Sequence, residues 1–196
     1  MTAQASDTVR YLGEKHALTA FSAGEPFDPK AFGYRPVMAS TACWRGYLCD
    51  YEVANDALRL AHLQINHQPS DNRASRALQP PPLAGVAATP AKATWVGRWE
   101  FSEVALPLPY SGGLVIARDF LRELYVHMGF HPAWKYQHVH ELLFEEGRLI
   151  EARDVSARMA TIREHARTPK PTGDASRETI EAWIRDCFSR DYARKG

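Results

Sequence analysis

Residues 40–65 read STACWRGYLCDYEVANDALRLAHLQI and contain the clearest strand–turn–strand pattern in the chain. Apolar and polar residues alternate on both sides of Asn55-Asp56, and both of these residue types tolerate the backbone of a tight hairpin turn. This turn sets a register with three apolar-face pairs, namely Val53 with Leu58, Tyr51 with Leu60, and Cys49 with His62. On the other face Glu52 lies opposite Arg59. The stretch therefore predicts a hairpin with one buried face.

Other segments extend this β-rich pattern. Residues 8–21 predict a hairpin turned at Gly13-Glu14, and residues 136–155 predict another turned at Glu146-Gly147. Residues 95–106 and 114–117 have strand patterning. Because strands do not alternate with helices, we expect an α+β fold built on a twisted antiparallel sheet.

Two helices are expected. A short one follows Asp119, carries apolar residues as far as Met128 and ends at Gly129. The second is an amphipathic C-terminal helix that Ser176 would cap. Its apolar stripe has helical spacing and comprises Ile180, Trp183, Ile184, Cys187 and Phe188. Such a stripe must be covered by the body of the protein, a second copy or a partner.

Length and composition suggest the domain organisation. A chain of 196 residues is most economically one domain. We expect a β-rich domain over residues 1–167, interrupted by a flexible Pro/Ala-rich insertion at 68–92. Residues 168–196 would form a linker and the C-terminal helix.

Charge and cysteine content bear on the environment and the partners. The net charge is +1, from 24 basic and 23 acidic residues, which argues against non-specific nucleic-acid binding. The sequence has no apolar run of membrane-spanning length and no secretory pattern at its N-terminus. Its three cysteines do not suggest a disulfide framework. We therefore expect a cytoplasmic protein that binds neither nucleic acid nor membrane.

The Cys49–His62 pair has two interpretations. Cross-strand neighbours lie about 5 Å apart at Cβ, so an imidazole there could activate the thiol. Alternatively, Cys49 is a small core residue and His62 lies at the sheet edge. The sequence contains no nucleophile elbow, Walker motif or dinucleotide fingerprint. The catalytic residues therefore stay unknown, and we expect binding rather than catalysis.

Four histidines occur within 14 residues, and His138 and His140 alternate along one predicted strand. With the two that precede them they could bind zinc or another divalent ion. No known metal-binding spacing accompanies them. The candidate metal ligands are His127, His131, His138 and His140.

Arg45 lies between Trp44 and Gly46. A guanidinium among aromatic rings could grip a carboxylate or phosphate, or it could tie a strand end to a neighbouring loop. Aromatic residues and arginine are also enriched in protein interfaces. The candidate binding surface comprises Trp44, Arg45, Tyr47, Tyr110 and His127.

Five segments together resemble a family of small uncharacterised bacterial proteins. They are DTVRYLGEKHAL, STACWRGYLCDYEVANDALRL, YSGGLVIARDF, YVHMGFHPAW and ELLFEEGRLIEARDV. The shared pattern is a TA-W-RGY strand, an SG-L segment, a Y-H-G segment and an E-G hairpin. It covers residues 7–155 without the insertion at 68–92, and the insertion and the helical tail depart from it. The resemblance implies a compact β-rich cytoplasmic domain and transfers no catalytic residue.

Three functions stay open from the sequence. The first is a non-catalytic protein-binding module, such as an immunity protein or antitoxin that neutralises a bacterial toxin. The second is a metal-binding or metal-dependent hydrolytic protein that uses the histidines. The third is a small-molecule binding domain in which Arg45 binds an anion inside an aromatic-lined pocket. We expect no cofactor, with a divalent metal such as zinc as the alternative. The C-terminal helix also makes a homodimer conceivable.

Overall fold

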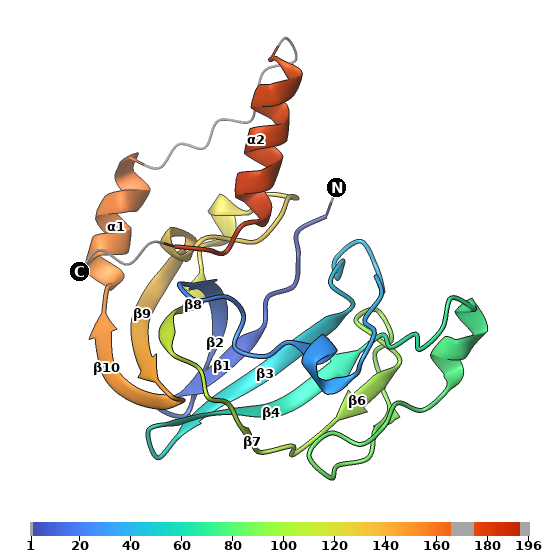
Figure 1. Ribbon diagram of the computed structural model, residues 1–196. Coiled ribbons are helices and arrows are strands. Elements are labelled where there is room, and N and C mark those ends of the chain that lie inside the picture. The colour runs from blue at the N-terminus through green and yellow to red at the C-terminus, as the bar shows by residue number, and fades with distance from the viewer. Residues whose placement is uncertain (1, 166–174, 193–196) are drawn as a thin grey trace.

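The computed structural model describes residues 2–165 and 175–192 (Figure 1). Within these residues the strands form one mixed, largely antiparallel sheet, so the expected fold class is confirmed. The strands are β1 (Thr8–Tyr11), β2 (Glu14–Phe21), β3 (Tyr47–Ala54), β4 (Ala57–Ile65), β5 (Thr89–Pro90), β6 (Trp99–Phe101), β7 (Leu106–Pro107), β8 (Gly112–Phe120), β9 (Tyr136–Glu145) and β10 (Arg148–Asp154). The strand order is β10-β9-β8-β2-β1-β3-β4-β6-β5, and β7 pairs with β4.

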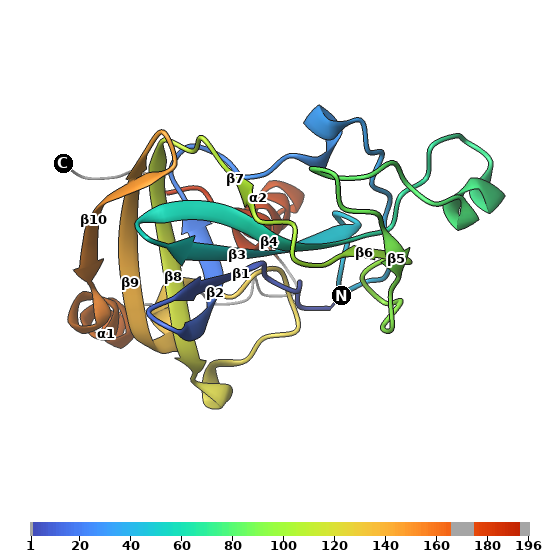
Figure 2. The same ribbon diagram turned by 90° about the horizontal axis from the view of Figure 1, so that it is seen from below.

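The sheet curls back on itself (Figure 2). Strand β10 pairs with β4 at Arg148 and Ala57, which brings two distant parts of the sheet together. Strands β1 and β3 pair in parallel, which makes the sheet mixed. The main core cluster contains fully buried residues from strands all around this curve, including Leu18, Leu60 and Leu114. Burying these side chains is the main energetic reason for the curled shape.

All three predicted hairpins are present. Asn55 and Asp56 have φ values of 51° and 58°, which fit the tight turn expected between β3 and β4. Glu146 and Gly147 turn β9 into β10 as expected. The first hairpin turns at Leu12-Gly13, one residue earlier than predicted, because β2 already begins at Glu14.

The predicted register of the central hairpin is correct near its turn and wrong beyond it. Val53–Leu58, Tyr51–Leu60 and Glu52–Arg59 pair as expected. A register shift follows Tyr51, so Cys49 lies opposite Leu63, and His62 lies opposite Asp50. The shift leaves Ala61 of β4 outside the pairing, and its carbonyl instead accepts a hydrogen bond from Val104. A β-bulge of this kind adds one residue to a strand and redirects the side chains after it.

The short helix expected after Asp119 is not formed. Strand β8 continues to Phe120, which pairs with Tyr136, and only a 3₁₀ turn follows at Arg122–Leu124. Asp119 has a φ of 61°, which does not fit a capping residue with extended backbone. Likewise, residues 95–106 form only β6 and the start of β7, since positive φ values at Glu103 and Ala105 interrupt a continuous strand.

Helix α1 (Ser156–His165) was not predicted, and it packs on the outer side of β9. Val155 and Met159 cover a second apolar cluster there that includes Val139 and Tyr136. The Arg163 guanidinium donates to the carbonyl oxygens of Trp134 and Tyr136, both at 2.6 Å, which ties the helix to the start of β9.

Helix α2 (Arg177–Phe188) confirms the expected C-terminal helix, and Ser176 Oγ accepts a hydrogen bond from Thr179 N. The helix extends away from the sheet, and its C-terminal end meets the loop that connects β8 to β9 (Figure 1). The predicted linker at 168–174 lies outside the described residues. Neither described helix has the length and hydropathy needed to span a membrane.

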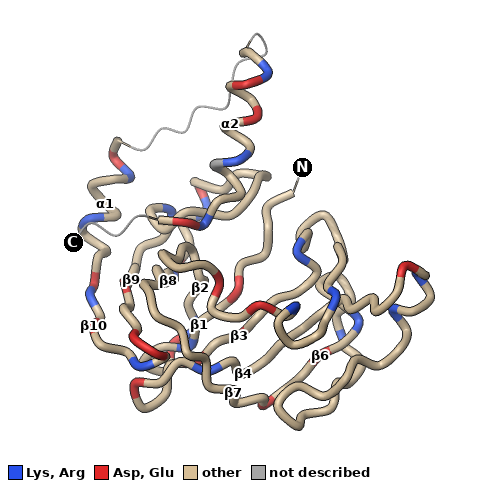
Figure 3. The backbone as a smooth tube through the Cα atoms, viewed as in Figure 1, with Lys and Arg blue, Asp and Glu red and all other residues tan. Residues whose placement is uncertain are grey.

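The Pro/Ala-rich insertion contributes to the core. It contains a 3₁₀ turn at Arg73–Ala77 and strand β5, which pairs with β6. Leu83, in the middle of the insertion, is fully buried in the main cluster. Acidic and basic residues are interspersed along the whole fold, as the balanced composition suggests (Figure 3).

Candidate functional site: an apolar pocket beneath the C-terminal helix

The loop between β8 and β9 docks against α2 through its backbone. Phe130 N donates a hydrogen bond of 2.8 Å to the carbonyl oxygen of Cys187. Gly129 has a φ of 57°, and a Cβ at this position would lie 1.9 Å from the same oxygen. Glycine is therefore required here both for its backbone conformation and for the close approach.

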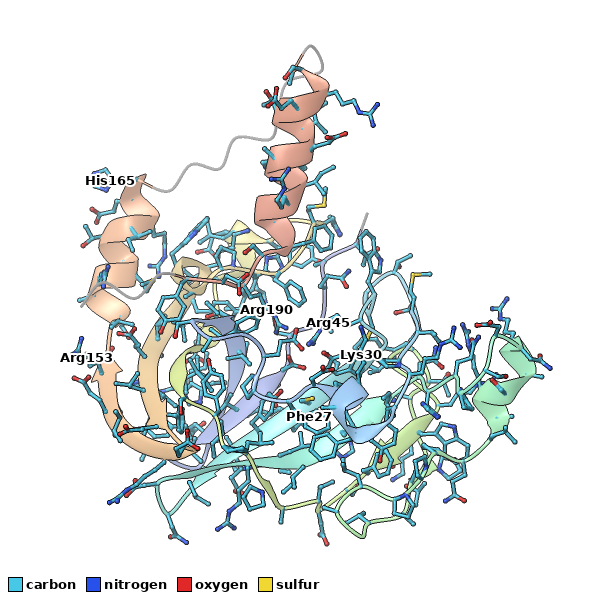
Figure 4. The ribbon with its side chains drawn as sticks, in the orientation of Figure 1. Phe27, Lys30, Arg45, Arg153, His165 and Arg190 are labelled. Carbon is cyan, nitrogen blue, oxygen red and sulfur yellow. The ribbon has the colours of Figure 1, made fainter. Side chains whose placement is uncertain are left out.

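A buried cluster of four charges holds the segment after α2. Asp7 Oδ1 accepts a hydrogen bond from Arg45 Nη2 at 2.8 Å, and Asp7 Oδ2 accepts one from Arg190 Nη1 at 3.0 Å. Glu25 accepts from the same two arginines, and the hydroxyl of Tyr47 also donates to it. Arg45 and Arg190 lie close together at the end of the sheet, below α2 (Figure 4). The cluster thus joins residues that lie far apart in the sequence.

The charges of this cluster compensate one another. Burial alone would raise the pKa of Asp7, but Arg45 and Arg190, with the hydrogen bonds that Asp7 accepts, lower it below its ordinary value. The two carboxylates in turn hold the pKa of Arg45 above its ordinary value, against the opposing effect of burial. Two guanidiniums thus meet two carboxylates. Arg45 therefore ties a strand end to neighbouring segments, which is the structural alternative considered for it.

Phe130 separates this cluster from a cavity of about 340 Å³. The guanidinium carbons of Arg190 and Arg45 lie 4.4 and 5.8 Å from its ring centroid. The cavity lies between the β8–β9 loop and α2, and most of its lining is apolar or aromatic. The lining residues are Val126, Met128, Phe130, Pro132, Trp134, Lys135, Trp183, Cys187 and Ser189.

Lys135 is the charged residue in this lining, and it is only 6% exposed. Its Nζ lies 5.3 Å from the ring centroid of Trp134, and no described carboxylate forms an ion pair with it. Burial lowers the pKa of Lys135, while the nearby Cys187 thiol acts in the opposite direction. The Nε1 atom of Trp183 is also buried, and it has no hydrogen-bond partner among the described residues. Among the described residues, the pocket therefore contains one buried donor without a partner, the indole N–H of Trp183, and one lysine without a carboxylate partner.

Only part of the predicted binding surface comes together. Arg45 and Tyr47 belong to the charge cluster, and Trp44 stacks on Phe188 with ring centroids 4.8 Å apart. Tyr110 is a core residue whose hydroxyl donates to the Gly113 carbonyl. A second cavity is lined by Trp44 and Arg45 among others. His127 packs edge-on against Tyr125 and lines neither this cavity nor the apolar pocket.

The four histidines considered as metal ligands are placed in different surroundings. His131 packs between Phe120 and Tyr125, where burial and then Lys135 lower its pKa to about 4. His138 approaches Asp119 at 3.5 Å, and His140 lies against His16. Within the described residues, no group of three or more His, Cys, Asp or Glu side chains is arranged to hold a metal ion.

Cys49 occupies the position of a core residue. It is fully buried, and burial raises the pKa of its thiol well above the ordinary value. His62 lies opposite Asp50, with Nδ1 at 3.4 Å from Ser102 Oγ. The structure thus separates the two residues that the predicted register placed opposite each other.

Sequence reasoning missed Lys135, Phe130 and Arg190. Two other lining residues, Trp183 and Cys187, were indicated by the sequence, because they belong to the predicted apolar stripe of α2. Lys135 had no comparable signal, because a lysine in a loop is ordinarily solvated.

Comparisons with protein-family models, with curated proteins and with solved structures found no match to this chain. The resemblance described from the sequence motifs therefore stays a prediction.

Proposed function

We propose that this protein binds a small molecule with an aromatic or otherwise apolar body and one hydrogen-bond acceptor in the pocket beneath α2. The observation that carries the proposal is a lysine, only 6% exposed, that lines an aromatic cavity and has no carboxylate partner among the described residues. Ligand pockets typically combine apolar walls with a few polar groups, and their volumes start at about 300 Å³. The cavity of about 340 Å³ fits the lower end of that range.

The unpaired polar groups supply the energetic argument. A buried donor without an acceptor costs about 1–3 kcal/mol. The indole N–H of Trp183 is such a donor, and the amine of Lys135 is a second donor in the lining of the pocket. A carbonyl or carboxylate oxygen on the ligand would relieve part of this cost, while the ligand body would cover Met128, Trp134 and neighbouring apolar atoms. This proposal keeps the small-molecule function considered from the sequence and moves its polar anchor from Arg45 to Lys135.

The test is a binding assay by intrinsic tryptophan fluorescence, since Trp134 and Trp183 both line the pocket. The probes are 2-naphthoate and 2-naphthaldehyde, which share one apolar body and differ in the acceptor. We expect saturable quenching with at least one probe, strong weakening in Lys135→Met, and unchanged binding in the control Lys92→Met, whose lysine is exposed. Absence of saturable binding with both probes, or equal affinity in the two variants, would refute the proposal.

Binding of a partner protein is a second proposal, and one surface favours it. Trp44 is 43% exposed although it stacks on Phe188, and large aromatic side chains of this kind serve as anchors in protein interfaces. The partner class suggested from the sequence is a bacterial toxin. Co-expression with a toxic neighbouring gene product tests this idea: rescue by the unaltered protein and loss of rescue in Trp44→Ala would support it. Equal rescue by both would exclude Trp44 as the anchor.

We also propose a cytoplasmic location. Cys43 and Cys49 are buried as thiols. A reducing compartment preserves such thiols. Fractionation of the native host, with detection of the untagged protein, tests this location.

A further inference from the structure

Lys135 is fixed at the pocket wall by the backbone on both sides. It is the last residue of the 3₁₀ turn Ala133–Lys135, and its N–H donates to the carbonyl oxygen of Pro132 at 3.0 Å. The Lys135 carbonyl oxygen accepts a hydrogen bond of 2.9 Å from Leu121 N. The side chain therefore enters the pocket from a well-anchored position.

The surroundings of Lys135 disfavour its ammonium form. The Lys135 residue is only 6% exposed, so most of its side chain is withdrawn from water, and no described carboxylate pairs with its amine. On one side, Arg163 places a guanidinium against the carbonyls of Trp134 and Tyr136, the two neighbours of Lys135. On the other side lie His131, whose low pKa keeps it uncharged at neutral pH, and the Cys187 thiol of α2. Burial therefore lowers the pKa of Lys135, so a larger share of its amine is in the free-base form than at an exposed lysine.

A free amine in an apolar pocket is a nucleophile. We propose that Lys135 captures an aldehyde or ketone ligand as an imine, an inference that rests on the proposed binding function and names the class of ligand. The Nζ lone pair attacks the carbonyl carbon, a C–N bond forms, and the displaced π electrons go to the carbonyl oxygen. The oxygen receives a proton and the nitrogen loses one. The carbinolamine then expels water, so that an amine and a carbonyl give an imine and water with no change in oxidation state.

The pocket suits this reaction in two ways. Its apolar lining, with Phe130 and Trp183 among the walls, limits the water that would hydrolyse the imine. The unpaired indole N–H of Trp183 is available to donate to the carbinolamine oxygen or to another acceptor of the ligand. A carboxylate ligand would instead form an ion pair with Lys135 in its protonated form, which makes the carboxylate the alternative outcome of the test.

The experiment is reductive trapping on the full chain. The protein is incubated with 2-naphthaldehyde and sodium cyanoborohydride at neutral pH, and the product is followed by intact mass and then by peptide mapping. We expect one adduct to form first at Lys135, ahead of exposed lysines such as Lys30 and Lys92. Mapping also separates this adduct from any adduct at the terminal amine.

Two variants and one control make the result decisive. Lys135→Met and Lys135→Gln should abolish the early adduct, and the glutamine variant keeps an uncharged hydrogen-bonding group in case the methionine variant alters the fold. Lys92→Arg should behave like the unaltered protein. Melting curves and near-ultraviolet circular dichroism verify that each variant is folded.

The outcomes separate this inference from the proposed function. Quenching by 2-naphthaldehyde without preferential trapping at Lys135 would overturn the imine and leave the binding function standing. Binding of 2-naphthoate alone would identify a carboxylate ligand and would also overturn the imine. Failure of both probes to bind would overturn both proposals, whereas early trapping that disappears in both Lys135 variants would support them together.

Discussion

Replacement of Asp7 by Asn should destabilise the fold strongly. The Asp7 side chain is 1% exposed and accepts three hydrogen bonds, from Arg45, Arg190 and the Cys49 backbone N–H. Asparagine removes the negative charge and turns one acceptor into a donor that would face a guanidinium donor. The buried Arg190 and the partly buried Arg45 would then share Glu25 alone.

The expected cost follows from the burial of the pair. Breaking a buried ion pair by removing one partner costs about 3–5 kcal/mol, because the remaining charge stays buried without compensation. Arg190, whose side chain is 2% exposed, would carry most of this penalty. Since typical domains have only about 5–15 kcal/mol of stability, the loss is a large part of the total.

The assay is urea denaturation followed by tryptophan fluorescence, with Asp71→Asn as the matched control. Asp71 undergoes the same chemical change, but its side chain is 92% exposed and pairs with Arg35 at the surface. Such a surface pair contributes about 0–1 kcal/mol. A loss in Asp7→Asn that is no larger than in Asp71→Asn would refute the assigned role of the cluster.

The same variant should show a pH signature. The pKa of Asp7 in the folded protein lies below its unfolded value of 3.8, so its ionisation stabilises the fold above that pH. This contribution is lost as the pH falls through the folded-state pKa. The difference in unfolding free energy between the unaltered protein and Asp7→Asn should therefore shrink below pH 3.8. A difference that stays constant into acid would contradict the assignment.

Two further substitutions probe how α2 is held. Gly129→Ala should loosen the docking of α2 and raise hydrogen exchange over residues 177–188, because the new Cβ would lie 1.9 Å from the Cys187 carbonyl oxygen. Gly24→Ala is its control, since Gly24 also has a positive φ but nothing within 4 Å of the added Cβ, so equal effects would argue against the close approach. Trp44→Ala should lose about 0.5–1.5 kcal/mol more than Trp95→Ala, because Trp44 stacks on Phe188 while both rings are similarly exposed. Equal melting temperatures in the two tryptophan variants would show that the stack contributes nothing.

The sequence predicted the parts of this fold that depend on neighbouring residues. Asn55-Asp56 and Glu146-Gly147 form hairpin turns because Asn55, Asp56 and Gly147 are residue types that accept positive φ values more readily than others. Ser176 caps α2 through a contact three residues away. The class of fold followed from such local signals.

The bulge at Ala61 and the extension of β8 to Phe120 required the tertiary structure. Each depends on pairing with a strand or loop that is distant in the chain, and the local pattern around Asp119 had favoured a helix. Helix α1 was missed for a similar reason. Its packing against Val139 depends on the curvature of the sheet, which the local sequence does not determine.

In the candidate site, too, some features follow from neighbouring residues and others from contacts between distant segments. The sequence by itself determined the apolar stripe of α2, and with it Trp183 and Cys187, because helical spacing is a property of consecutive residues. It also indicated that Arg45 would either bind an anion or tie segments together. Only the tertiary structure decided between these roles, by bringing Asp7, Glu25 and Arg190 to Arg45. Only the fold could bury Lys135 away from every carboxylate that the structure describes, since desolvation and charge pairing depend on all segments that surround an atom and not on its neighbours in the chain.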